Sequence, residues 1–171
     1  TDITIDLDGV LEVTEQITVS AQGIKIKRGI FRDIPTQYKD FQDNPIRVLL
    51  QVDEVLKDGL PTIYTVEKIK NGKRIKIGEK DVFLQPGIYT YTIKYLTINQ
   101  IGFFQDFDAV YFNGIGNSWA FPIDKAKVTL RLPEGVQILE YKCYTGEKKE
   151  IGENYKIKMT SNAIRFDNIH P

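Results

Sequence analysis

The stretch IYTYTIKYLTI, residues 88–98, alternates large aromatic or aliphatic side chains with polar ones. In a β-strand successive side chains point to opposite faces, so one face of this segment would collect four large residues. These residues are Tyr89, Tyr91, Ile93 and Tyr95. The other face would carry Thr90, Thr92 and Lys94. The pattern predicts a half-buried strand whose aromatic face lies in the core of an all-β protein.

Similar strand patterns recur about every ten residues on both sides of this stretch, while helical periodicity is almost absent. Residues 3–19 predict a hairpin that turns at Asp8-Gly9, and Asn71-Gly72 predicts a hairpin between residues 60–70 and 73–79. Further strands are expected at 46–56, 127–133, 136–144, 154–160 and 163–169.

Short strands punctuated by Gly and Pro imply antiparallel sheets that pack face to face. The fold class we predict is therefore all-β, an antiparallel β-sandwich of the immunoglobulin or fibronectin type (Ig/fibronectin-like), with a barrel as the alternative. No repeat, low-complexity tract or linker divides the sequence, so we expect residues 1–171 to form a single domain. A domain of this size buries roughly 70% of its unfolded surface and needs no metal or disulfide to fold.

Two regions interrupt the strand rhythm. Residues 27–45, KRGIFRDIPTQYKDFQDNP, show no periodicity, so we expect a long loop. A connection of that length in a compact domain is usually functional or disordered. Residues 99–110 are rich in Phe and Asp, and we expect one short helical turn there.

The segment FNGIGNSWAFPI, residues 112–123, combines two glycines, two asparagines and the only tryptophan of the chain. A phosphate-binding loop requires a helix after the glycines, whereas SWAFPI has the composition of a strand, and the lysine of a P-loop is missing. The glycines and asparagines at 113–117 instead predict a tight turn between two strands. We expect Trp119, in the second strand, to be a core anchor.

The composition excludes several classes of function. Lys plus Arg and Asp plus Glu each number 23, so no field of one sign favours nucleic acid, and we predict no nucleic-acid partner. His170 is the only histidine, one residue before the last, and Cys143 is the only cysteine. No base is therefore available in the body of the chain for Ser–His or Cys–His catalysis, and zinc lacks its usual ligands. We predict no catalytic residues, no metal and no cofactor, and we expect Cys143 to be a small buried hydrophobe.

Three blocks of sequence carry a family resemblance: GIFRDIP at 29–35, IGEKDVFLQPGIYTYTIKY at 77–95 and FDAVYFNGIGNSWAFPIDKAKVTLRLP at 107–133. They resemble the YciQ-like family of predicted bacterial membrane proteins, a domain of unknown function. Phe112 stands where that family usually has Trp. The matching positions are Gly29, Arg32, Ile34, Pro35, Gly87, Tyr91, Ile93, Tyr95, Asp108, Tyr111, Asn113, Gly116, Trp119, Pro122 and Ile123.

The resemblance implies an N-terminal extracytoplasmic domain, made with a signal peptide and anchored by transmembrane helices outside this chain. It implies no activity, so no catalytic residue is carried over from the family. No apolar run in the sequence approaches the roughly 20 residues that a membrane span requires. Membrane attachment is therefore expected through segments absent from this chain.

One candidate binding site collects residues of the long loop and of the segment before residue 112. Its members are Arg28, Arg32, Asp33, Asp106, Asp108, Tyr111 and Asn113. In the structural interpretation Arg32 pairs with Asp108 or Asn113 and pins the loop onto the sandwich, since its planar guanidinium suits bidentate bonding. In the functional interpretation Arg32 clamps a carboxylate, sugar or peptide in a groove with Tyr111 as a wall.

Two functions follow from these features. The first is a non-enzymatic extracytoplasmic module that contacts a protein or cell-envelope component and is monomeric as an isolated domain. The alternative is a carboxylate-dependent hydrolase acting on polysaccharide or peptide, for which Asp106 and Asp108 are the acids nearest to each other in the candidate site. The scarcity of His and Cys and the balanced charge favour the first.

Overall fold

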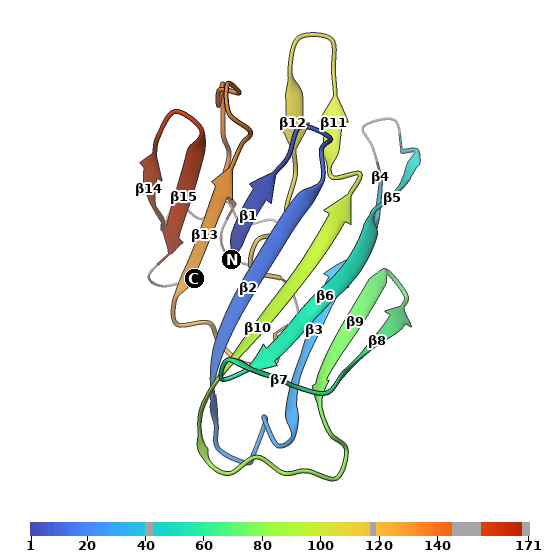
Figure 1. Cartoon of the computed structure of the whole chain (residues 1–171), viewed down its shortest axis with the longest axis vertical. Coiled ribbons are helices and arrows are strands. Elements are labelled where there is room, and N and C mark those ends of the chain that lie inside the picture. The colour runs from blue at the N-terminus through green and yellow to red at the C-terminus, as the bar shows by residue number, and fades with distance from the viewer. Residues whose placement is uncertain (40–42, 117–118, 145–154, 169–171) are drawn as a thin grey trace.

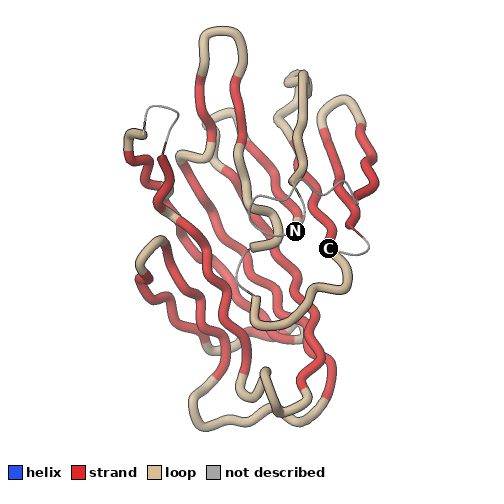
Figure 2. Tube along the Cα trace, turned by 180° about the vertical axis from the view of Figure 1, so that it is seen from behind, coloured by secondary structure: helices blue, strands red, loops and turns tan. Residues whose placement is uncertain are grey.

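The structure is a computed structural model of the chain that describes residues 1–39, 43–116, 119–144 and 155–168. Within these ranges the regular structure is entirely β, with fifteen strands joined by turns and loops (Figure 2). The predicted all-β class is confirmed. No helix of the described residues is long and apolar enough to cross a membrane.

Eight strands form the large sheet, in the order β14-β15-β13-β1-β2-β10-β6-β7 (Figure 1). Their bounds are β1 Asp2–Ile5, β2 Leu11–Ala21, β6 Leu49–Lys57, β7 Leu60–Pro61, β10 Gly87–Ile98, β13 Ala126–Arg131, β14 Tyr155–Met159 and β15 Ala163–Asn168. Neighbouring strands are antiparallel except for β1 and β13, which pair in parallel.

Three strands form the small sheet, in the order β3-β9-β8. Their bounds are β3 Gly29–Pro35, β8 Tyr64–Ile69 and β9 Gly72–Gly78. Two further two-stranded ribbons are β4 (Gln37–Lys39) with β5 (Pro45–Arg47), and β11 (Ile101–Phe103) with β12 (Asp108–Val110). The β11–β12 hairpin projects beyond the neighbouring strand ends (Figure 1).

One cluster of buried apolar side chains draws on both sheets, which gives the sandwich-like arrangement. The large sheet contributes inward residues of β1, β2, β6 and β10, and the small sheet contributes Ile30, Ile34, Ile75 and Ile77. Strand β10 is central because it pairs with β2 along Gly87–Thr97 and with β6 along Tyr91–Ile98. Of the four residues predicted on its core face, Tyr91, Ile93 and Tyr95 are buried and Tyr89 is half-buried.

The predicted hairpins are also confirmed. Asp8-Gly9 joins β1 to β2, and the Asp6 carboxylate accepts hydrogen bonds from the backbone N–H groups of Asp8 and Val10. Asn71-Gly72 leads from β8 into β9. The expected strand at 60–70 is instead divided between β7 and β8, which lie in different sheets.

The prediction of a long loop at 27–45 is wrong, because Gly29–Pro35 form strand β3. The inward positions of β3 are Ile30, Arg32 and Ile34, so the segment does alternate. The charged Arg32 occupies a buried position, and a hydrophobicity pattern counts it as polar. The strand was missed for this reason.

The helical turn predicted within 99–110 is also wrong, since the segment forms the β11–β12 hairpin. The strands predicted at SWAFPI and at 136–144 are absent from the described residues 119–123 and 136–144, which are irregular. Trp119 is half-buried in a loop and does not lie in a core strand. Cys143 is half-buried, and burial raises the pKa of its thiol.

Candidate functional site

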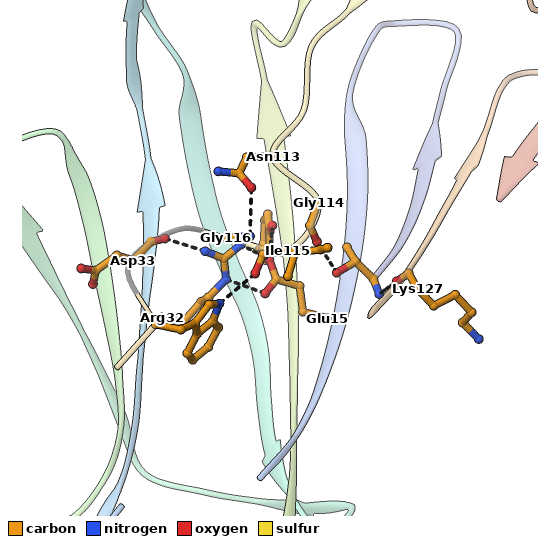
Figure 3. A network of polar contacts seen from close by, with 11 residues as sticks. Glu15, Arg32, Asp33, Asn113, Gly114, Ile115, Gly116 and Lys127 are labelled. Atoms are coloured by element: carbon orange, nitrogen blue, oxygen red, sulfur yellow. Dashed lines mark hydrogen bonds and ion pairs between the residues drawn. The ribbon is translucent and has the colours of Figure 1, made fainter. Parts of the chain in front are cut away.

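Arg32 extends from β3 of the small sheet toward the large sheet and forms an ion pair with Glu15 of β2 (Figure 3). Its Nε donates to Glu15 Oε2 at 2.6 Å and its Nη2 donates to Glu15 Oε1 at 2.8 Å. Both residues are 2% exposed. The two planar groups thus form a bidentate, charge-assisted pair that links the sheets inside the protein.

The remaining polar atoms of this pair are also bonded. Arg32 Nη1 donates to the carbonyl oxygen of Asp33 at 2.6 Å. The Tyr95 hydroxyl, from β10, donates to Glu15 Oε1 at 2.7 Å. Three donors therefore converge on the Glu15 carboxylate. Hydrogen bonds of this kind help to offset the free-energy cost of removing the two charges from water.

Burial and charge act in opposite directions on this site. Burial alone would lower the pKa of Arg32, but the Glu15 charge and its hydrogen bonds offset this and raise the pKa above its ordinary value. The pKa of Tyr95 is raised well above its usual range, first by burial and then by the negative charge of Glu15. Arg32 is therefore a permanent cation, and the Tyr95 phenol stays protonated.

The 113–116 turn covers the guanidinium of Arg32. Gly116 has a φ of +84°, and a Cβ built there would overlap Arg32 Nη1. The side-chain oxygen of Asn113 accepts a hydrogen bond from the Gly116 N–H at 2.9 Å. The Trp119 indole N–H donates to the carbonyl of Ile115 at 3.0 Å. Only glycine fits position 116, because this backbone lies directly on a charged side chain.

The same turn is fixed to the large sheet from its other side. The Thr1 hydroxyl donates to the Gly114 carbonyl at 2.6 Å. A Cβ at Gly114 would lie 2.7 Å from a methyl group of Val128, on β13. The glycines therefore serve close packing. The predicted tight turn is present at 113–116, but no strand follows it in the described residues 119–123.

Of the predicted site residues, the structure brings Arg32, Asp33 and Asn113 together around the buried pair. The partner of Arg32 is Glu15, which corrects the prediction of Asp108 or Asn113. The Asp33 side chain points elsewhere and accepts hydrogen bonds from Arg74 Nε and Nη2 at 2.7 and 2.8 Å. The hydrogen bond from Arg74 is the main cause of a lowered pKa of Asp33.

The other predicted residues lie on the surface. The Arg28 guanidinium stacks over the Phe83 ring at 4.2 Å. Asp106 and Asp108 are exposed on the β11–β12 hairpin, and Tyr111 is 68% exposed. Tyr111 therefore does not line a groove around Arg32, whose side chain is enclosed.

Sequence reasoning missed Glu15, although a signal for it was present. Buried positions in β2 recur with a period of two, and Glu15 falls in phase with Leu11, Val13 and Val19. A carboxylate in the inward phase of one strand and a guanidinium in the inward phase of another predict a buried pair. Among the described residues no group of three His, Cys, Asp or Glu side chains could hold a metal ion.

Fold and site together define an all-β domain in which a buried ion pair, between Arg32 of the first block and Glu15, joins two sheets. Residues 1–169 match the family model described as Predicted membrane protein (DUF2207) N-terminal domain, and the chain belongs to this family. The resemblance of the three sequence blocks to YciQ-like proteins is thereby confirmed.

The similar proteins have the following relation to this chain. It is 29% identical over 158 residues to the uncharacterized protein YciQ of Escherichia coli (strain K12), covering 91% of this chain and 25% of that protein. The chain thus spans a quarter of the length of this curated relative. Among solved structures, native yeast LTA4 hydrolase matches 98% of this chain and 25% of its own chain, with a TM-score of 0.50 and 12% identity. At that identity the likeness concerns the fold alone.

Proposed function

We propose that this chain is a non-enzymatic domain on the extracytoplasmic side of the membrane, where it mediates contacts with protein or cell-envelope components. The observation that carries the proposal is the closed hydrogen-bonding of the buried site. Arg32, Glu15 and Tyr95 bond to one another and to backbone, and Gly116 covers them. Polar groups used in this way hold two sheets together and are not available to a substrate.

The β11–β12 hairpin supports the contact role. Phe103 is 74% exposed and Phe107 is 54% exposed, and Phe107 stacks on Phe104 with ring centroids 5.1 Å apart. Exposed aromatic side chains on a projecting element are typical anchors of protein interfaces. As an isolated domain the protein is proposed to be monomeric and to bind its partner through such surfaces.

The family and the sequence resemblance support the proposed side of the membrane. The family is one of predicted membrane proteins, and the sequence resemblance implies export of this N-terminal domain. One cysteine in the chain means that the fold requires no internal disulfide. In the full-length protein, flanking segments would anchor the domain to the membrane.

Topology is tested in intact cells with the full-length protein in a background without other reactive cysteines. Cys143 is replaced by serine, and Met159, which is 56% exposed on β14, is replaced by cysteine. A membrane-impermeant maleimide should label M159C before lysis. Labelling only after lysis would place the domain on the cytoplasmic side and overturn this part of the proposal.

The contact role is tested by placing a photocrosslinking amino acid at Phe103 of the full-length membrane protein. Irradiation should give a discrete crosslinked product that the same group at Met159 does not give. Identical products from both positions would indicate random collision and would contradict a specific contact. Cleavage of cell-wall polysaccharide or peptide substrates that is lost in Asp106→Asn or Asp108→Asn would instead favour a hydrolase.

A further inference from the structure

A groove of about 460 Å³ runs beside the first half of β6. Six of the residues that line it are Arg47, Leu49, Lys68, Lys73, Leu96 and Ile98. We call it the cationic groove, because three of these residues are basic and none of its lining residues among the described part of the chain is acidic. Its volume is within the range of small-ligand sites.

The groove lies along an unpaired strand edge. β6 pairs with β10 along its whole length, but β7 pairs only with its last residues, Leu56 and Lys57. No described strand is paired to the other edge of β6 at residues 49–53. An exposed edge of this kind can accept an extended peptide as an additional strand.

Two basic residues of the groove are cross-strand neighbours and repel each other. Lys68 of β8 and Lys73 of β9 are directly opposite in the register of the hairpin. Like charges in that position destabilise a sheet. Lys73 Nζ donates to the Leu50 carbonyl at 2.9 Å, while Arg47 and Lys68 form no ion pair with a described residue. An anionic group in the groove would relieve this repulsion.

The floor of the groove is apolar. Leu49 is 54% exposed and Ile98 is 38% exposed, and these two residues are paired across β6 and β10. Leu96 is half-buried beside them. A strand that alternates acidic and aliphatic side chains could place one set against the leucine and isoleucine side chains and the other near the cations.

We propose that the cationic groove binds an extended acidic peptide segment of a partner protein, which adds a strand along the free edge of β6. The proposal rests on the contact role proposed above and specifies a surface and a partner chemistry for it. Edge-facing backbone groups of residues 49–53 supply affinity, apart from the Leu50 carbonyl, which already accepts from Lys73 Nζ, and the three cations select carboxylates. The free edge favours a peptide over a phosphate polymer, since a phosphate chain has no N–H groups to pair with β6.

The probes are two fluorescent peptides of about six residues, the common length of a strand. One alternates Glu with Val and the other alternates Lys with Val. Fluorescence anisotropy with the folded domain should show saturable binding of the acidic probe, weakened by added salt. Amide NMR shifts should concentrate at residues 49–53. Absence of binding by the acidic probe, or equal binding of both probes, would overturn the proposal.

Charge reversal supplies a matched comparison. The double substitution Arg47→Glu and Lys68→Glu should weaken binding of the acidic probe by about tenfold or more. The control is Lys156→Glu with Lys158→Glu, the same change at exposed lysines on β14, at the opposite edge of the large sheet. The control should change affinity by less than about twofold. Equal losses of affinity in both variants would mean that binding of the probe depends only on net charge, which would overturn the assignment of the peptide site to the groove.

A third arm uses vesicles that contain phosphatidylglycerol. Vesicle binding that needs Arg47 and Lys68, together with no binding of the acidic peptide, would assign the groove to a lipid surface and overturn the proposal. The proposal of a peptide site in the groove can fail without the proposed contact role failing, and one experiment distinguishes the two. A specific Phe103 crosslink in the Arg47→Glu, Lys68→Glu variant would leave the contact role standing without the groove.

Discussion

Arg32 and Glu15 show how a charged residue can occupy a core position. Removing two ions from water costs several kcal/mol for each, and their attraction repays this only when every donor and acceptor is bonded. Here the Glu15 carboxylate accepts from Nε and Nη2 of Arg32 and from Tyr95, and the third guanidinium nitrogen, Nη1, donates to the Asp33 carbonyl. Loss of one partner would leave the other charge buried and unpaired.

Arg32→Met should therefore lower the free energy of unfolding by about 3–5 kcal/mol, and Glu15→Leu should lower it by a similar amount. The double variant should lose less stability than the sum of the two single losses. The remaining loss of about 1–3 kcal/mol is expected because the Tyr95 hydroxyl no longer has an acceptor. Urea unfolding followed by Trp119 fluorescence measures all three. Arg131→Met is the control, because its pair with Asp2 is half-exposed and should contribute less than about 1 kcal/mol. If the losses of the two single variants add up in the double variant, Arg32 and Glu15 are not energetically coupled.

Two tyrosines of β10 form a natural comparison. Tyr91 and Tyr95 are each 1% exposed, but only the Tyr95 hydroxyl is bonded, while that of Tyr91 has no partner among the described residues. Tyr95→Phe should cost about 1.5–3 kcal/mol, the contribution of a hydrogen bond to a charged group. Tyr91→Phe should be neutral or stabilise by about 1 kcal/mol, because it removes an unsatisfied polar atom. Equal losses in thermal unfolding would contradict this assignment.

The same tyrosines set the response to alkali. Burial is the main cause of the raised pKa of both phenols, so the folded state holds their protons more tightly than the unfolded state. Their contribution is fully present below the unfolded pKa of about 10 and is lost as the pH rises beyond it. Urea titrations above pH 10 should show falling stability, with a shallower decline in Tyr95→Phe. An unchanged decline would show that the alkaline loss arises elsewhere.

Substitution of Gly116 tests whether the 113–116 turn, which covers the Arg32 guanidinium, contributes to stability. Gly116→Ala would place a side chain at a positive φ and against the Arg32 guanidinium, so we expect a loss of several kcal/mol, of the size typical of core overpacking and strain. Gly135→Ala is the matched control, because Gly135 also has a positive φ, +85°, but a Cβ there meets nothing within 4 Å. It should cost only about 1 kcal/mol, from the backbone strain. Equal costs in urea unfolding would show that the guanidinium contact is unimportant.

At the scale of elements, the β11–β12 hairpin pairs only with itself among the described strands. Phe103 and Asp108 are its last paired residues before the tip, so Asn-Gly in place of residues 104–107 should keep the register through a two-residue turn. Because the replaced rings are exposed, we expect the free energy of unfolding to change by less than about 1 kcal/mol. Calorimetry checks this, and a loss of several kcal/mol would mean that the tip supports the core.

Elements that the sequence predicts well are those in which local turn chemistry and alternation agree. β10 and the hairpins at Asp8-Gly9 and Asn71-Gly72 are of this kind. β3 was missed because a buried ion at position 32 breaks its apolar alternation. The β11–β12 hairpin was mistaken for a helical turn because its phenylalanines face solvent, so their spacing does not report on the core. The residues 136–144 alternate like a strand but find no strand partner in the described structure.

The candidate site was predictable only in part. Arg32, Tyr95, Asn113, Gly116 and Trp119 stand at positions that carry the family resemblance, and the structure brings them together. Glu15, the partner of Arg32 and Tyr95, lies outside the three blocks. The alternation of β2 indicates that Glu15 points inward. Which inward carboxylate meets Arg32 depends on how the two sheets face each other, and no local pattern encodes that arrangement.

At the scale of the whole molecule, the two sheets have one shared core and one shared ion pair. Ile30, Ile34, Ile75 and Ile77 of the small sheet belong to the same buried cluster as the β10 side chains. A three-stranded sheet alone could not bury this face, so we expect it to unfold together with the large sheet.

Far-ultraviolet circular dichroism, near-ultraviolet circular dichroism and Trp119 fluorescence should therefore give coincident urea transitions. Trp119 reports on the turn over Arg32, and the tyrosines of β10 report on the core between the sheets. In Arg32→Met the midpoint should fall while the three curves remain coincident, because the apolar contacts between the sheets persist. Two separate transitions in the unmodified protein would mean that the sheets are independent units, and the buried pair would then be a contact between domains and not the centre of one domain.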